Sequence, residues 1–84
     1  QLRLDLELAE ENIRITEKTR ISAERSFILA QERYRLERAS ELELAEAEAI
    51  YSSSKAAYMQ SIYNYNITAA RLDRAIGGTD EVDK

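Results

Sequence analysis

The sequence predicts an all-α fold, an antiparallel two-helix coiled-coil hairpin. The chain of 84 residues has no proline, and its two glycines are Gly77 and Gly78, so nothing before them breaks a helix strongly. Two stretches carry small and apolar residues at the three- and four-residue steps of a coiled coil. Between them, Ser40 followed by Glu43 has the spacing of a helix capping box. These observations divide the chain into a first helix at 1–34, a tip at 35–40, a second helix at 41–76 and a polar tail at 77–84.

The first helix is expected to face its partner along one heptad row. This row, the first-helix seam, consists of Leu6, Ala9, Ile13, Thr16, Arg20, Ala23, Phe27, Ala30 and Tyr34. Thr16 and Arg20 are the two members that depart from an apolar pattern. The rest of the helix mixes acids with bases, which indicates a well-solvated outer face.

The second helix carries two rows at heptad spacing. The row expected to face the first helix, the second-helix seam, consists of Leu42, Ala45, Ala49, Ser52, Ala56, Met59, Tyr63, Asn66 and Ala70. The flanking row consists of Leu44, Tyr51, Tyr58, Tyr65 and Leu72. Lys55 is the one charged residue between Ala49 and Ala70. This helix should therefore bury a wider face than the first and leave the flanking row for a further helix, so that the chain self-associates.

The capping box and the seams together define an antiparallel pairing. It places Tyr34 opposite Leu42, Phe27 opposite Ala49, Ile13 opposite Tyr63 and Leu6 opposite Ala70. The residues expected to carry the helix packing are Phe27, Tyr34, Leu42, Ala49, Tyr51, Tyr58 and Tyr65. Gly77, as a cap after Ile76, would end the second helix level with the start of the chain. One continuous helix of about 75 residues, on the order of 110 Å long, stays open as an alternative, because nothing in residues 35–40 forbids a helix.

The composition excludes most catalytic and metal-dependent functions. The chain has no His and no Cys, so it lacks the usual neutral-pH base, the thiolate nucleophile and the strongest metal ligands. We expect no enzymatic activity, no catalytic residue, no cofactor and no metal site. The acids after the tip point to different sides of their helix, so solvation is expected rather than metal binding. These acids are Glu41, Glu43, Glu46 and Glu48.

The net charge and the hydropathy limit the possible partners. With 12 Lys and Arg against 16 Asp and Glu, the net charge of -4 gives no reason to expect nucleic-acid binding. No stretch reaches the roughly 18 to 20 apolar residues of a membrane-spanning helix. Residues 1–8 do not resemble a secretory signal, because Arg3, Asp5 and Glu7 alternate with the leucines. We expect an extramembrane piece of a longer protein.

Two blocks of the sequence resemble the TolC-like outer membrane efflux proteins. Residues 32–47, ERYRLERASELELAEA, are similar to that family's tip signature, in which E-R-Y is followed by a Gly, a Ser or Thr, and a leucine-acid-leucine run. Residues 63–67, YNYNI, and 72–77, LDRAIG, are similar to its second block, in which Y-x-Y precedes L-x-x-A-x-G. The likeness covers nearly the whole chain in matching order and spacing.

The resemblance implies a fragment of a periplasmic α-barrel, namely the second helical hairpin of an efflux duct. In such ducts three subunits form an outer-membrane barrel and a periplasmic tunnel for drugs, metals or exported proteins. It implies a homotrimeric parent, the periplasmic portion of a bacterial outer-membrane protein, with a periplasmic adaptor and an inner-membrane pump as partners. The adaptor would meet the tip at Arg35, Leu36, Glu37, Arg38 and Ser40.

Glu37 departs from the family pattern, which has Gly at this position. Glycine would permit a positive φ and a close approach of a partner backbone, whereas Glu permits neither without cost. We therefore expect either another turn geometry or a different adaptor contact. A free-standing coiled-coil interaction module, with a likeness that arose by convergence, stays open as the alternative function.

Overall fold

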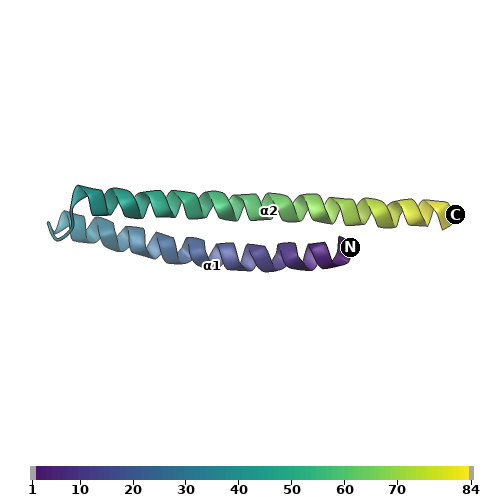
Figure 1. The fold of residues 1–84 in the computed structure, drawn as a ribbon, viewed down its shortest axis with the longest axis horizontal. Helices are drawn as coiled ribbons and strands as arrows, with labels where there is room; N and C mark the ends of the chain where they lie inside the picture. The colour runs from purple at the N-terminus through teal and green to yellow at the C-terminus, as the bar shows by residue number, and fades with distance from the viewer. Residues whose placement is uncertain (1, 84) are drawn as a thin grey trace.

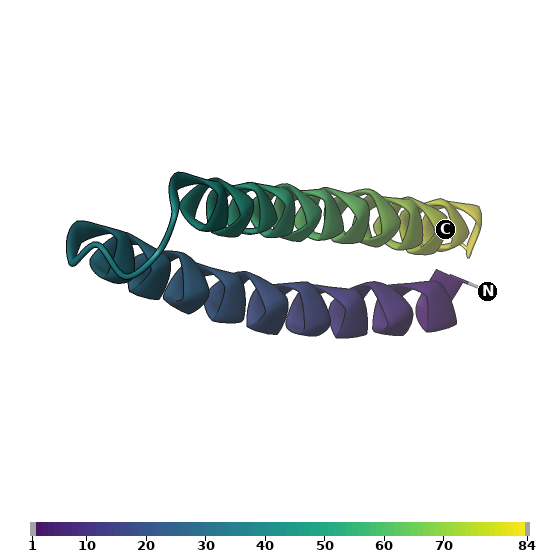
Figure 2. The same ribbon diagram turned by 60° about the vertical axis from the view of Figure 1, so that its left-hand side comes forward.

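The computed structural model describes residues 2–83 as two long helices joined by a short turn. Helix α1 spans Leu2–Arg35 and helix α2 spans Glu41–Asp83. They run antiparallel and side by side along a rod of 69 × 15 × 14 Å (Figures 1 and 2). The all-α hairpin is therefore confirmed, and the alternative of one continuous helix is excluded.

Helix α2 differs from its expected length. It continues through Gly77 to Asp83, so its C-terminal end projects past the start of α1 (Figure 1). A glycine cap requires a left-handed backbone, and no glycine in the described chain has a positive φ. Glycine inside a helix costs only about 1 kcal/mol, so Gly77 and Gly78 weaken this segment without ending it. The two arms are consequently unequal, with 34 residues in α1 and 43 in α2.

The helices meet through a layer of small side chains. Among residues 2–76, the ones buried between the helices are Ala23, Ala30, Ser54 and Ser61. Ser61 is 1% exposed, and its hydroxyl donates to the carbonyl oxygen of Tyr58 at 2.6 Å. Its Oγ also lies 2.8 Å from Oγ1 of Thr16, which joins the two helices by a hydrogen bond. Small residues at these positions allow the two backbones to approach closely.

Larger side chains line one side of this small layer. The rings of Phe27 and Tyr51 stack with centroids 5.6 Å apart and an interplanar angle of 27°. The guanidinium of Arg20 lies 5.1 Å from the centroid of the Tyr58 ring. Tyr65 is half-buried in the same row. The first-helix seam therefore faces α2 as the heptad spacing predicts, except for Tyr34, which is exposed, and its polar member Arg20 lies against an aromatic face.

The second-helix seam, in contrast, faces away from α1. Leu42, Met59 and Tyr63 are 67%, 67% and 60% exposed, and Ala49 is also exposed. The predicted pairs must therefore be corrected: Phe27 lies against Tyr51, not opposite Ala49. Both rows repeat every seven residues, so the spacing alone does not select between them. The flanking row, with Tyr51, Tyr58 and Tyr65, lies next to the buried Ser54 and Ser61 on α2. Because these serines are small, α2 approaches α1 closely on this side, and the flanking row packs against α1.

A larger residue in the layer of small side chains should destabilise the hairpin, whereas the same substitution on the surface should not. Leu at position 54 adds a branched side chain where the helices touch, so Ser54→Leu should lower the free energy of unfolding by about 1–3 kcal/mol. Urea titration followed by circular dichroism measures the change. The matched control is Ser53→Leu at the exposed neighbouring position, which should alter stability by less than about 0.5 kcal/mol. Equal stability of the two variants would contradict the small-layer packing.

Candidate partner-binding surfaces

The hairpin tip is closed by a hydrogen-bonded helix terminus. The Arg38 N–H donates to the Arg33 carbonyl oxygen at 2.7 Å, and the Glu37 N–H donates to that of Tyr34 at 2.9 Å. This pair of bonds is the Schellman motif, which satisfies carbonyl groups that the end of a helix leaves free. Glu37 occupies its left-handed position with a φ of 62°. The turn thus has the geometry that glycine usually provides, and a glutamate adopts it.

Helix α2 begins at a side-chain cap. The Glu43 N–H donates to Oγ of Ser40 at 3.1 Å, and the Leu44 N–H donates to the Ser40 carbonyl oxygen at 3.1 Å. Ser40 is therefore the N-cap residue, as the sequence predicts. Within the described chain, the Glu43 carboxylate pairs with Nη1 of Arg33 at 3.6 Å and does not bond back to Ser40. The second half of the capping box is replaced by a contact between the helices.

Two side chains at the end of α1 bind the turn to α2. Nη2 of Arg33 donates to the Arg38 carbonyl oxygen at 3.0 Å while Nη1 faces Glu43. The Tyr34 hydroxyl donates to Oε1 of Glu41 at 3.3 Å. The heptad pattern predicts Tyr34 in the helix packing opposite Leu42. Tyr34 lies instead in the last turn of α1 beside the tip, and its side chain is 39% exposed. These contacts fix the orientation of the tip relative to both helices.

The tip presents an exposed surface of mixed chemistry. All five residues of the predicted partner-facing set, Arg35, Leu36, Glu37, Arg38 and Ser40, are exposed. Arg35 pairs with Glu32 on its own helix, and Ser40 is engaged as a cap. In the described residues Glu37 and Arg38 have no side-chain ion pair, so both charges are available to a partner. Leu36, at 50% exposure, adds an apolar contact.

A second candidate surface is the outward side of α2. All nine residues of the second-helix seam are exposed there, in two columns on the side opposite α1. The outward side of α1 carries Glu7, Arg14, Lys18 and Arg25 and is well solvated. Because the second-helix seam lies on this outward side of α2, it is an outer seam of the hairpin. Its coiled-coil spacing and lack of charge are typical of a helix-packing surface.

One long side of the interface is a charged and aromatic network. Glu24 lies 3.7 Å from Nη1 of Arg20 and accepts a hydrogen bond from the Tyr51 hydroxyl at 3.4 Å. Nζ of Lys55 lies 4.8 Å from the centroid of the Tyr51 ring. The Arg20 Nε is buried without a hydrogen-bond partner. The Arg20 guanidinium lies over the Tyr58 ring, whose face attracts a cation.

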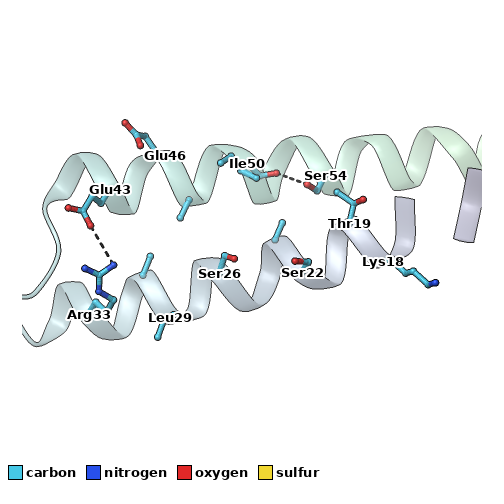
Figure 3. Close-up of a pocket in the computed structure, with 13 residues that line it drawn as sticks. Lys18, Thr19, Ser22, Ser26, Leu29, Arg33, Glu43, Glu46, Ile50 and Ser54 are labelled. Carbon is cyan, nitrogen blue, oxygen red and sulfur yellow. Dashed lines mark hydrogen bonds and ion pairs between the residues drawn. The ribbon is translucent and has the colours of Figure 1, made fainter. Parts of the chain in front are cut away.

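The opposite long side is an open groove of about 700 Å³. Its lining includes Ala23, Ala30 and Ala47 together with the exposed side chains of Leu29 and Ile50. Figure 3 shows it between the two helices, with the Arg33–Glu43 ion pair near the turn and Ser54 donating to the Ile50 carbonyl oxygen at 2.8 Å. Its polar side chains are small hydroxyls and peripheral charges. They do not converge on a point that could bind a small molecule in one orientation.

The described residues contain neither a metal-binding cluster nor a membrane-spanning segment. No group of three or more Asp and Glu in this part of the chain is placed to hold a metal ion. Of the two helices, as far as they are described, neither is long and apolar enough to cross a membrane.

Comparison with known proteins gives no match of any kind. No protein-family model matches the chain, no curated protein matches it, and no solved structure matches it.

The backbone of Glu37 provides a test of the tip geometry. A left-handed conformation costs a residue with a Cβ about 1 kcal/mol or more, so Glu37→Gly should raise the free energy of unfolding by about 0.5–1 kcal/mol. Glu48→Gly is the matched control at an exposed position inside α2, and it should lower that free energy by about 1 kcal/mol. Thermal unfolding followed by circular dichroism measures both. If Glu37→Gly destabilises the chain as Glu48→Gly does, the left-handed turn is wrong.

Proposed function

We propose that this chain is a wall and entrance-tip segment of a trimeric outer-membrane efflux duct of the TolC-like type. In that role the helices form part of a periplasmic α-barrel, and the tip docks a periplasmic adaptor that connects the duct to an inner-membrane pump. Small molecules or exported substrates would leave the periplasm through the tunnel. The chain itself acts by shape and by binding, with no catalytic step.

The observation that carries this proposal is the conformation of Glu37. The resemblance assigns this position to a glycine in the family signature, and the residue has a φ of 62°, in the region that favours glycine. The E-R-Y stretch ends α1 and Ser40 begins α2, so the signature falls on the turn and its two flanks. The residues that resemble the family thus have the local geometry that the family's glycine suggests.

The two rows of α2 support a role in a wall. A helix inside a closed wall of helices needs a neighbour on each side, whereas a helix at the edge of a hairpin needs only one. Helix α2 packs its flanking row on α1 and exposes the outer seam on the opposite side. Each row has the spacing of a coiled-coil contact. This arrangement suits a helix that lies between two others.

A second candidate function is a free-standing coiled-coil interaction module. The observation that favours it is the same outer seam, since an exposed row of uncharged residues can bind any helix of matching pattern. The two functions differ in what the tip does. A duct segment needs the tip for adaptor recognition, whereas an interaction module uses the sides of its helices and leaves the tip without a partner.

Charge removal at the tip tests the duct proposal. In the complete duct protein to which the proposal assigns this chain, Glu37→Gln together with Arg38→Gln should weaken adaptor capture by cross-linking at least about tenfold, since hydrogen bonds to charged groups contribute about 1.5–3 kcal/mol each. Export should fall in parallel, because the adaptor is needed to couple the pump. Helicity and trimer formation should be unchanged, since neither side chain has an ion pair in the described chain.

The matched control removes one acid and one base from the helix shafts. Arg25→Gln with Glu48→Gln changes two exposed side chains away from the tip and should leave both capture and export intact. If the tip variant captures the adaptor and exports normally, the tip is not the docking site. The tip variant and its control are compared in the assembled trimer. Three subunits present several tips at once, so a weak contact at each tip gains affinity through the high effective concentration of the others.

A further inference from the structure

The backbone of Arg38 is bonded to Arg33 at both of its polar groups. The Arg38 N–H donates to the Arg33 carbonyl oxygen at 2.7 Å, and the Arg38 carbonyl oxygen accepts from Nη2 of Arg33 at 3.0 Å. These two groups belong to the planar peptide units on either side of Arg38, so neither unit can rotate without breaking a bond to Arg33. Glu37, in its left-handed conformation, lies directly before Arg38. Arg33 therefore holds the segment that carries both charges available to a partner.

The same guanidinium connects this segment to α2. Its Nη1 lies 3.6 Å from a carboxylate oxygen of Glu43 (Figure 3), and the Glu43 N–H donates to Oγ of Ser40. Arg33, Arg38, Ser40 and Glu43 thus form a closed ring of contacts around the turn, the tip ring. Because Nη1 and Nη2 belong to one planar group, each contact orients that group for the other. The tip ring joins the end of α1 to the start of α2.

The tip ring orders the turn more than it strengthens the helices. The side chains of Arg33 and Glu43 are 50% and 52% exposed, and ion pairs at such exposure contribute little to folding stability. The helix ends on either side are closed by backbone bonds and by the Ser40 cap, none of which uses the guanidinium. In the part of the chain that the structure describes, no other side chain donates to the backbone of residues 36–39. Loss of the Arg33 side chain should therefore free the turn and leave both helices folded.

We propose that Arg33 is a positioning residue for the docking of the tip to its protein partner. It holds the backbone of Glu37 and Arg38 in one conformation, so that their side chains meet the partner in a fixed arrangement, and it makes no contact with the partner itself. This inference rests on the docking function proposed above and adds a residue outside the predicted partner-facing set. A partner that binds one arrangement has an apparent affinity proportional to the fraction of tips in that arrangement.

Substitutions at position 33 test the role of the guanidinium in the complete duct protein. Arg33→Gln should weaken adaptor capture by cross-linking about two- to tenfold, because a smaller fraction of tips is then correctly arranged. Arg33→Lys should weaken capture to a similar extent, since an ammonium keeps the charge but lacks the planar fork that binds two groups at fixed positions. Arg25→Gln is the matched control, which removes an exposed base from the shaft of α1 and should leave capture unchanged. Full capture with Arg33→Lys would mean that charge alone matters, which contradicts the proposal.

A double-mutant cycle tests whether Arg33 acts through the two charged side chains of the tip. When Glu37→Gln and Arg38→Gln are already present, Arg33→Gln should weaken capture no further, because the charges that it positions are gone. An equal loss in both backgrounds would mean that Arg33 contacts the partner directly. No loss in either background would mean that Arg33 has no part in docking. Each of these two results overturns the proposal.

Amide hydrogen exchange tests the positioning in the 84-residue chain without any partner. Arg33→Gln should speed exchange of the Arg38 amide about two- to tenfold, while the amide of Ala23, buried in the middle of α1, should keep its original rate. Unchanged exchange at Arg38 would show that the turn is rigid without Arg33 and would overturn the proposal. Normal capture by Glu37→Gln with Arg38→Gln would instead reject the docking function, whatever the exchange rate of Arg38, so the two failures are separate results.

Discussion

The close contact between the two helices depends on the small residues of their shared layer. Ala23 and Ala30 on α1 and Ser54 and Ser61 on α2 are the buried residues among residues 2–76, and side chains of this size let the backbones come near enough for Thr16 and Ser61 to bond. Because the two backbones are this close, larger side chains do not fit between them and lie along one side of the small layer. Stacking of Phe27 on Tyr51 follows from this arrangement. The remaining row of α2 is then left on the outside.

Much of the fold follows from local signals in the sequence. The lack of proline, the heptad row of α1 and the Ser40 cap are short-range features, and each acts within one or two turns of helix. They suffice to predict two helices and the turn between them. The phase of α2 is not predictable in this way, because its two rows have the same spacing and the choice depends on which row meets the small residues of α1. The continuation past Gly77 also escapes prediction, since glycine weakens a helix but does not forbid it.

The candidate site is predictable in position more than in geometry. The exposed residues of the tip follow from the location of the turn, so Arg35, Leu36 and Arg38 lie where expected. The left-handed backbone of Glu37 is unusual for a residue with a Cβ and conflicts with simple propensity. Two backbone hydrogen bonds and the Arg33 side chain support it from the α1 side, and sequence spacing does not reveal such support. The cost at one residue is offset by satisfied groups around it.

The polar and small character of the contact layer also determines how stability should change with temperature. Among residues 2–76 the fully buried apolar side chains are the two alanines Ala23 and Ala30, and the larger ones such as Phe27 and Tyr51 are half-buried, so folding removes less hydrocarbon from water per residue than in a globular domain. The heat capacity change of unfolding follows exposed apolar area and is about 12–15 cal/mol/K per residue in globular domains. This hairpin should lie below that range. Its stability curve should accordingly be shallow, with a broad thermal transition and little loss of structure on cooling.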